Sequence, residues 1–282
     1  MIVFLNGQFV PEEKAVVSVF DRGFLYGDGL FETFRVCSGK PFLWEQHMLR
    51  LQQGIELLRI PAPYTPEQLR KFATELITQN KMPNAILRLT ISRGVGPRGY
   101  SPKGADQPSV VMSLHPAPAL DPEHPPQWNL ITSSVRLPTN DPLTQSKTCN
   151  KLSQVLARSE ADAHGVNEAL LLTTHGEVAE ASSSNLFWIE NGSVCTPPLA
   201  GTILPGVTRA MVLEICKKLS IPSDQMATTP AKLVQSEGVF LSLSSLGIVE
   251  AVTLDGQKLQ RSDLVKVIRD SYNEALAAHC GL

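Results

Sequence analysis

The chain has 282 residues, of which 43% are hydrophobic and 18% charged, so it is long and apolar enough to bury a large core. Lys and Arg number 25 against 27 Asp and Glu, which gives a formal charge of -2 and a sequence pI near 6.3. This balance argues against binding to nucleic acid or to an anionic membrane, because both usually require a basic excess.

The N-terminal residues, the cysteines and the histidines bear on location and on metals. The apolar run at residues 1–5 has no basic leader and ends at Asn6, too early for a signal peptide or a membrane span. The five cysteines are widely spaced and form no CxxC pair, so neither a disulfide framework nor a zinc knuckle is expected. No two of the six histidines have ligand spacing. We therefore expect a soluble, cytoplasmic protein without a metal.

The first 120 residues predict a small lobe of strands and two helices. Asn6-Gly7 supplies the positive φ angles of a tight turn and is expected to join strands at residues 2–5 and 15–20. Apolar positions at helical spacing predict a helix from residue 47, and Thr65-Pro66 starts a second one. Further strands are expected at residues 30–36, 41–43, 85–92 and 109–114.

A proline-rich segment at residues 116–127 predicts an extended linker, which divides the chain into lobes at residues 1–120 and 121–282. The second lobe is expected to contain strands at residues 128–135, 169–173, 185–189, 239–243 and 248–252, and helices at residues 151–164, 207–219, 231–235 and 262–278. Strands and helices do not alternate regularly, which predicts an α+β fold.

Two small-residue segments do not match familiar catalytic motifs. The segment 27–32 (GDGLFE) ends in Glu where a dinucleotide loop needs Gly, and it leads into a strand. Ser182-Ser183-Ser184 has no neighbouring histidine in the sequence and is interpreted as a polar turn.

A Pro-Gly turn at residues 204–209 (LPGVTR) is more informative. A helix that begins there would present free backbone N–H groups and a positive dipole end, which suit a phosphate. Ser242, Ser244 and Ser245 follow an apolar strand and are candidate donors to the same anion.

Three further charged residues gain meaning from their order in the chain. Arg50 lies in the first helix, Lys147 in a polar turn before the helix at 151–164, and Glu180 at the start of a Ser-rich turn, where an acid is normally exposed. Together with the segment 21–29 (DRGFLYGDG), Asn150, the segment 185–187 (NLF) and the Pro-Gly turn, they resemble the fold-type IV family of pyridoxal-phosphate (PLP) enzymes. The resemblance extends from Asn6 to the C-terminal helix.

The family includes the branched-chain aminotransferases, the D-amino-acid aminotransferases and 4-amino-4-deoxychorismate lyase. The resemblance implies a small N-terminal α/β lobe and a larger C-terminal PLP-binding lobe with a barrel-like sheet. It also implies a homodimer with the active site at the lobe junction and a loop borrowed from the partner.

The resemblance assigns cofactor roles to individual residues. Lys147 would carry PLP and afterwards move the proton, and Glu180 would hydrogen-bond the pyridine nitrogen. The phosphate would be bound by Arg50, by the backbone N–H groups of Val207 and Thr208, and by the hydroxyl of Ser244. A carboxylate beside the ring nitrogen keeps it protonated, and an arginine with a helix N-terminus suits a phosphate dianion.

Within the family, the segment 91–101 (ISRGVGPRGYS) resembles the lyase pattern, in which Arg98 and Tyr100 meet the substrate carboxylate. Lys151 stands where branched-chain aminotransferases have an aromatic residue, and Phe31 replaces a tyrosine that D-amino-acid aminotransferases place near the substrate. Glu32, in contrast, matches an acid that many family transaminases carry.

We therefore expect a lyase that converts 4-amino-4-deoxychorismate to pyruvate and p-aminobenzoate, a folate precursor. The alternative is an aminotransferase of branched-chain or D-amino acids, and a non-catalytic PLP-binding protein is a third reading. The partner in each case is a small amino substrate.

Overall fold

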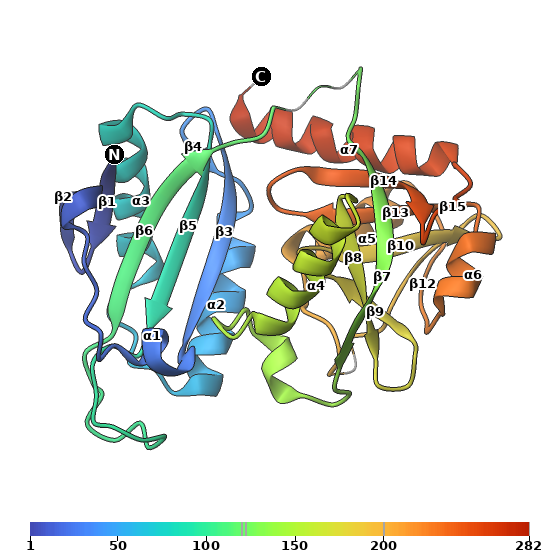
Figure 1. Cartoon of the computed structure of the whole chain (residues 1–282). Coiled ribbons are helices and arrows are strands. Elements are labelled where there is room, and N and C mark those ends of the chain that lie inside the picture. Colours follow the sequence, from blue (N-terminus) through green and yellow to red (C-terminus); the bar gives the residue numbers. More distant parts are fainter. Residues whose placement is uncertain (120, 122, 200, 282) are drawn as a thin grey trace. The chain divides into compact units, whose positions relative to one another are not determined.

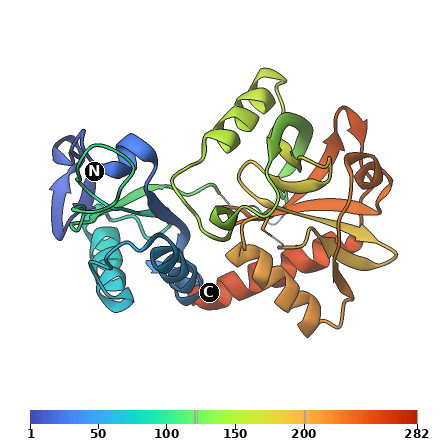
Figure 2. The same ribbon diagram turned by 90° about the horizontal axis from the view of Figure 1, so that it is seen from below.

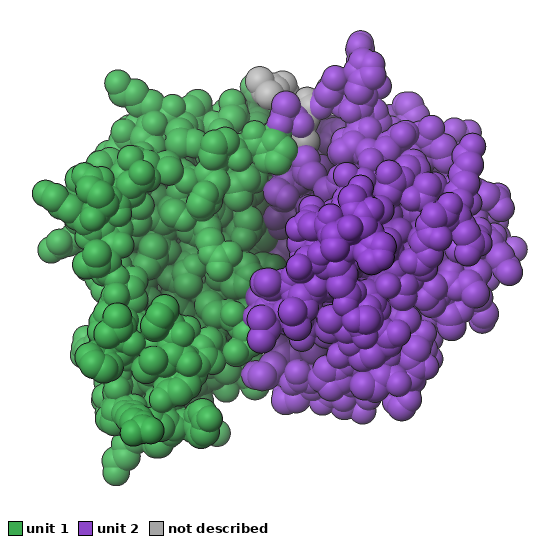
Figure 3. All heavy atoms as spheres, in the orientation of Figure 1, with its two compact units in different colours: residues 1–118, 146–150, 276–282 green, residues 119–145, 151–275 purple. Residues whose placement is uncertain are grey.

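The structure is a computed structural model that describes residues 1–119, 121, 123–199 and 201–281. It divides into two compact units, which Figure 3 shows in different colours. Unit 1 comprises Met1–Pro118, Ser146–Asn150 and Leu276–Leu282, and unit 2 comprises Ala119–Gln145 and Lys151–Ala275. Unit 1 thus includes two segments beyond the boundary predicted at residue 120. Of the predicted linker at 116–127, Leu120 and Pro122 lie outside the described residues.

Unit 1 is built on an antiparallel six-stranded sheet in the order β2-β1-β6-β5-β3-β4. Its strands are β1 (Ile2–Leu5), β2 (Gln8–Pro11), β3 (Gly29–Cys37), β4 (Lys40–Pro41), β5 (Ala85–Ser92) and β6 (Ser109–Pro116). Two helices, α2 (Trp44–Leu58) and α3 (Pro66–Asn80), cover one face of the sheet, as Figures 1 and 2 show. Alternate apolar residues of β3, β5 and β6 pack against them to form the core.

The N-terminal hairpin differs from the prediction. Asn6-Gly7 turns the chain, but β1 pairs with β2, in the register Leu5↔Gln8, and not with residues 15–20. A two-residue turn pairs the residues that directly flank it, so the later apolar run could not be the partner. That run contains no strand, and Val16 is 75% and Phe20 65% exposed.

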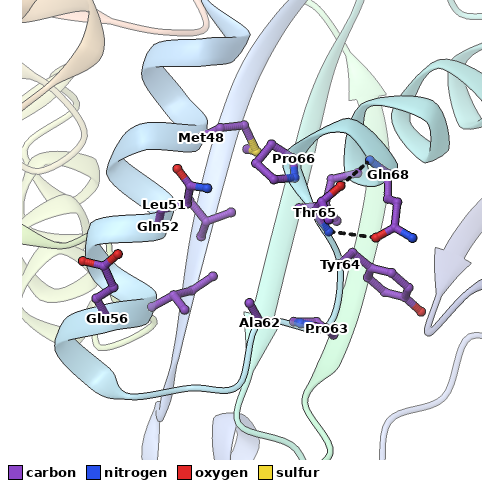
Figure 4. Close-up of a pocket in the computed structure, with 12 residues that line it drawn as sticks. Met48, Leu51, Gln52, Glu56, Ala62, Pro63, Tyr64, Thr65, Pro66 and Gln68 are labelled. Carbon is purple, nitrogen blue, oxygen red and sulfur yellow. Dashed lines mark hydrogen bonds between the residues drawn. The ribbon is translucent and has the colours of Figure 1, made fainter.

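The second helix of unit 1 begins as predicted. The Thr65 hydroxyl accepts a hydrogen bond from the Gln68 backbone N–H at 3.3 Å, and the Gln68 side chain accepts one from the Thr65 N–H at 2.8 Å. This reciprocal capping box, drawn in Figure 4, satisfies two backbone donors at the start of α3. The first helix, α2, begins at Trp44, three residues before the predicted start.

Unit 2 contains a mixed nine-stranded sheet that curls as a half-barrel (Figure 1). Its order is β12-β11-β10-β13-β14-β7-β8-β9, with β15 paired to β14. The strands are β7 (Gln127–Leu137), β8 (Glu168–Thr173), β9 (Val178–Ala181), β10 (Asn185–Glu190), β11 (Ser193–Thr196), β12 (Ser223–Gln225), β13 (Gly238–Leu243), β14 (Gly247–Leu254) and β15 (Gln257–Lys258). The predicted α+β class is confirmed, because strands and helices are both abundant and do not alternate regularly.

The helices of unit 2 lie within two residues of their predicted bounds. They are α4 (Leu152–Ala163), α5 (Val207–Lys218), α6 (Pro230–Gln235) and α7 (Asp263–Cys280), whose last residues are grouped with unit 1. None of the described helices is both long enough and apolar enough to cross a bilayer.

A disulfide in unit 1 contradicts the sequence expectation. Cys37, the last residue of β3, is joined to Cys280, the last residue of α7, with the two Cα atoms 5.4 Å apart. The two cysteines are 243 residues apart in the chain, so spacing gave no indication of their proximity. Cys149, Cys195 and Cys216 remain as thiols.

Replacing Thr65 with alanine should lower the free energy of unfolding by about 1 kcal/mol, because α3 loses its N-cap acceptor. Thr74→Ala is the matched control, since Thr74 is exposed inside α3 and alanine is the better helix former. Urea unfolding measures both. Equal midpoints for Thr65→Ala and the wild type would show that the capping box contributes no stability.

Candidate active site

The position of Lys147 is set by strand pairing within unit 1. The Phe31 N–H donates to the Lys147 carbonyl at 2.9 Å, and the Cys149 N–H donates to the Gly29 carbonyl at 2.8 Å. Leu30 therefore lies opposite Thr148, whose side chain is buried. Side chains alternate along an extended segment, so Lys147 turns to the other face. Its Nζ atom lies 4.7 Å from the centroid of the Phe31 ring, and two predicted site residues thus meet.

The end of this segment is held by a glycine contact. Gly27 follows α1 (Arg22–Tyr26) with a φ of 67°, in the left-handed region, and its carbonyl accepts a hydrogen bond from Asn150 Nδ2 at 3.2 Å. A Cβ at Gly27 would lie 2.4 Å from Asn150 Oδ1. Asn150, three residues after Lys147, therefore anchors the lysine segment, and the Gly-Asp-Gly sequence allows its close approach.

Beneath the sheet, a buried carboxylate holds Arg50. Glu32 accepts hydrogen bonds from Arg50 Nε at 2.8 Å and Arg50 Nη2 at 2.6 Å. His47 Nδ1 lies 2.6 Å from Glu32 Oε2. Burial alone would raise the pKa of Glu32, but the charge of Arg50 and the hydrogen bonds from His47 and Arg50 lower it to about 2. The predicted phosphate ligand is thus oriented by an acid whose partners the sequence did not identify.

His47 is neutral in this cluster. Its burial lowers its pKa more than the hydrogen bond to Glu32 raises it, and the nearby charges of Arg50 and Lys147 act in the same direction as burial. Because an ionised carboxylate only accepts, the Nδ1 atom of neutral His47 carries the proton and donates it to Glu32. The cluster therefore has one negative charge and one permanent positive charge.

The loop between β5 and β6 carries Arg98 and Tyr100. Buried Arg22 donates to the carbonyls of Gly99 at 2.8 Å and Tyr100 at 3.1 Å, and its Nε donates to Asp28 at 2.9 Å. The backbone of the loop is thus held to α1, but the loop projects beyond the strands in Figure 1. Tyr100 is 88% exposed and its ring meets that of Tyr26. The side chain of Arg98 is exposed as well.

In unit 2, Glu180 lies in a strand and not in the predicted turn. It belongs to β9, because Val178 and Ala179 continue the buried pattern of the sheet. The Glu180 carboxylate accepts a hydrogen bond from the Leu204 N–H at 3.0 Å. It also lies 3.5 Å from Asn185 Nδ2, which donates to the Leu204 carbonyl at 3.0 Å. The predicted acid is therefore attached to the Pro-Gly turn.

Helix α5 begins at Val207 immediately after that turn, as predicted. Gly206 is its N-cap and supplies no side chain to the first N–H groups. A Cβ at Gly206 would lie 1.9 Å from Asn185 Oδ1, so only glycine fits against the asparagine. The backbone N–H groups of Val207 and Thr208 lie in the first turn, where a helix has no carbonyl partner for them.

A buried serine supplies a second polar group in this part of unit 2. Ser242 lies opposite Asn185 in the β10–β13 pairing, and α5 packs against β13. Within the described ranges, the buried Ser242 Oγ atom has no hydrogen-bond partner. A buried donor without a partner and a helix N-terminus both suit a phosphate. Ser244, the serine predicted for this role, follows in the turn after β13.

A hollow of about 430 Å³ lies elsewhere, between α2 and α3 (Figure 4). Its wall contains none of the predicted site residues. The residues that line it are Met48, Leu51, Gln52, Ile55, Glu56, Ala62, Pro63, Tyr64, Thr65, Pro66, Gln68 and Leu69. Over the described part of the chain, no group of three or more His, Cys, Asp and Glu residues is arranged to hold a metal.

The description "Amino-transferase class IV" applies to the family profile that matches residues 29–253, which is most of the chain. The chain belongs to this family. It is therefore a PLP-dependent enzyme, and the fold-type IV resemblance seen in the sequence is confirmed.

The relatives include both activities considered above. A putative branched-chain-amino-acid aminotransferase of Methanocaldococcus jannaschii is 34% identical over 97% of this chain and 96% of its own length. The 4-amino-4-deoxychorismate lyase from Pseudomonas aeruginosa is 32% identical, with a TM-score of 0.85 over 96% of this chain and 98% of that one. A branched-chain amino acid aminotransferase from T.th., solved with N-(5'-phosphopyridoxyl)-L-glutamate, has a TM-score of 0.89 at 27% identity, over 99% and 94%.

The residues present fit PLP. The helix N-terminus at Val207 and the unpartnered Ser242 hydroxyl suit its phosphate, and the Glu180 carboxylate suits a protonated ring nitrogen. Lys147 is an amine beside an aromatic ring, and its role as the residue that carries PLP stays a prediction, as do the roles of Arg50 and Glu180.

Glu32 should make the fold sensitive to acid. Its pKa is lowered from 4.5 to about 2 in the folded chain, so ionised Glu32 stabilises the fold above about pH 4.5, and this contribution is lost as the pH falls from there towards 2. The loss should amount to roughly 3 kcal/mol. Glu32→Gln should therefore lower stability at pH 7 and should narrow the difference from the wild type at pH 3.

Urea unfolding at pH 7 and pH 3 measures this effect. Glu56→Gln is the matched control, because Glu56 is an exposed acid in α2. A Glu32→Gln protein as stable as the wild type at pH 7 would contradict the assignment.

Proposed function

We propose that the protein is a 4-amino-4-deoxychorismate lyase that releases pyruvate and leaves p-aminobenzoate, a folate precursor, in the cytoplasm. The observation that carries this proposal is the β5–β6 loop, in which Arg98 and Tyr100 stand on a backbone that Arg22 holds through two carbonyls. A guanidinium on such a loop suits a substrate carboxylate. The near full-length likeness to the Pseudomonas aeruginosa lyase supports the same choice.

Under this proposal, Lys147 carries PLP, Glu180 holds the proton of its ring nitrogen, and the phosphate is bound by Arg50, Val207 N–H, Thr208 N–H and the hydroxyl of Ser244. When bound, PLP supplies an aldehyde that bonds to amines and a ring that accepts electrons from the substrate. Arg98 and Tyr100 hold the substrate carboxylate, and Phe31 lines the substrate site.

Lys147 Nζ takes the proton from the substrate carbon that carries the amino group. The bond from the neighbouring ring carbon to the enolpyruvyl oxygen then breaks, and its electrons leave with that oxygen. The enolpyruvyl group takes up one proton at its methylene carbon as it becomes pyruvate. The ring becomes aromatic, so the products together contain all the atoms of the substrate, and neither an oxidant nor a second substrate is needed.

An aminotransferase is the second candidate, favoured by the Methanocaldococcus jannaschii relative, which covers nearly the whole chain. Lys147 would then move a proton between the substrate Cα and the cofactor. The amino group would stay with the protein until a keto acid accepted it. The residues proposed to bind PLP are the same for both reactions, so they do not discriminate between them.

The PLP-loaded protein mixed with 4-amino-4-deoxychorismate, without a keto acid, should release p-aminobenzoate and pyruvate in equal amounts. Lys147→Ala should lose both this turnover and the visible absorbance of protein-bound PLP, because it removes the amine that bonds the aldehyde. Lys71→Ala, an exposed lysine of α3, is the matched control and should retain both.

Either product in the absence of the other would contradict the lyase mechanism. If neither forms while a known lyase works in the same mixture, the lyase assignment is wrong. L- and D-amino acids with 2-oxoglutarate or pyruvate then test the aminotransferase.

We also propose that the protein is a homodimer. Large apolar side chains lie exposed on unit 1 in the segment after β2, including Val19 and Phe20, and Phe24 of α1 is 74% exposed. Arg22 links this segment to the loop of Tyr100, so they form one surface. Contiguous apolar surface of this kind is typical of a protein–protein interface.

Light scattering after size-exclusion chromatography should give twice the chain mass of 30.7 kDa. Phe20→Asp should shift the protein towards the monomer, because a charge at an apolar interface is costly to bury. Leu57→Asp, at an exposed apolar residue of α2, should leave the mass unchanged. A wild-type protein that elutes with the mass of one chain would contradict the dimer.

A further inference from the structure

Arg88 lies in the middle of β5, on the face of the sheet that α2 and α3 do not cover. Its neighbours along the strand, Leu87 and Leu89, point into the core under the two helices. In the β3–β5 register Arg88 lies opposite Thr33. Because side chains alternate along a strand, Arg88, Thr33 and Phe31 share the other face.

The guanidinium of Arg88 lies on an aromatic ring and has no counter-ion among the described residues. Its central carbon is 3.9 Å from the centroid of Phe31. Among the residues that the structure describes, it makes neither a hydrogen bond nor an ion pair. The side chain is half-buried, and this burial lowers its pKa. The other partly or fully buried arginines of unit 1 differ: Arg22 and Arg93 pair with Asp28, and Arg50 pairs with Glu32.

Stacking leaves the donors of Arg88 available. The N–H groups of a guanidinium lie in its plane, so a ring that covers one face blocks none of them. A half-buried cation with unused donors is costly unless an anion binds there. Two parallel N–H groups match the two oxygens of a carboxylate.

The same ring also contacts the reactive lysine. Lys147 Nζ is 4.7 Å from the centroid of Phe31, so Phe31 brings the two cations together on one face of the sheet. We propose that Arg88 binds a carboxylate of the amino substrate that reacts at Lys147. With Arg98 assigned to one carboxylate, Arg88 takes another, and the enzyme selects amines that carry two carboxylates.

This inference rests on the proposed function, because it requires a substrate amine that reacts at Lys147. It also goes beyond it, since it names the chemical class that the site selects. 4-Amino-4-deoxychorismate belongs to that class, and so does glutamate. The inference can therefore be tested whether the reaction is elimination or amino transfer.

The test compares the PLP-loaded wild type with Arg88→Gln, Arg88→Lys and Arg70→Gln. Arg70 is the matched control, because it is an exposed arginine of α3 that pairs with Glu45. Titration with PLP gives the cofactor affinity. Calorimetry with glutarate and butyrate, which differ by a second carboxylate, gives ligand affinity without turnover. KM and kcat are measured with 4-amino-4-deoxychorismate, or with glutamate and alanine if the enzyme is an aminotransferase.

Arg88→Gln should weaken glutarate binding and raise the KM for the dicarboxylate substrate by roughly 10- to 100-fold, because it removes a charge-assisted hydrogen bond. Arg88→Lys should recover part of this loss, since it restores the charge and not the paired donors. Butyrate binding and PLP affinity should remain close to those of the wild type, and Arg70→Gln should behave as the wild type.

Three results would overturn the inference. The first is an unchanged glutarate affinity in Arg88→Gln, and the second is a loss of PLP affinity, which would make Arg88 a cofactor ligand. The third is a shift of Arg88→Gln towards the monomer with unchanged glutarate binding, which would mean that a second copy of the chain supplies the anion. A wild type that binds glutarate through Arg88 but has no lyase activity would overturn the lyase assignment alone.

Discussion

The short pairing of residues 147–149 with the start of β3 is the constraint on which the site in unit 1 depends. Two backbone hydrogen bonds and the Leu30–Thr148 bridge extend the sheet by one small segment. Alternation then decides that Thr148 enters the core and Lys147 faces Phe31. A slip of one residue would exchange the two side chains and remove the amine from the site.

Unit 1 contains three arrangements of buried charge, and their differences separate structural from binding roles. Asp28 joins Arg22 and Arg93, and this pairing holds the β5–β6 loop to the sheet. Burial raises the pKa of Asp28, but hydrogen bonds from the two flanking arginines lower it further than burial raises it. Glu32 is enclosed with Arg50 and His47 beneath the sheet. Among these described arginines, Arg88 alone has a ring beneath it and no acid beside it.

Unit 2 achieves anion binding by different means. The Pro-Gly turn before α5 brings backbone N–H groups to a point that Asn185 and Glu180 also reach. No basic side chain is needed for this, because the first turn of a helix presents donors and a partial positive charge. Gly206 is required by the close approach of Asn185, and the buried Ser242 hydroxyl lies in the same strand pair without a partner among the described residues. A family that shares such a cofactor site can differ in its reaction only through the residues that meet the substrate.

Much of the secondary structure could be predicted from the sequence, because apolar periodicity, Thr65-Pro66 and the Pro-Gly turn act over a few residues. The order of Arg50, Lys147, Glu180 and the 204–209 turn also sufficed to indicate the family, since chemistry at these positions leaves a linear pattern. Tertiary structure decided the rest, because it depends on contacts between distant segments. Examples are the pairing of β1 with β2 in place of residues 15–20, the Cys37–Cys280 disulfide, and the strand position of Glu180. The partners of Glu32 and the stacking of Arg88 on Phe31 belong to the same class, because burial and charge pairing are properties of the folded sheet.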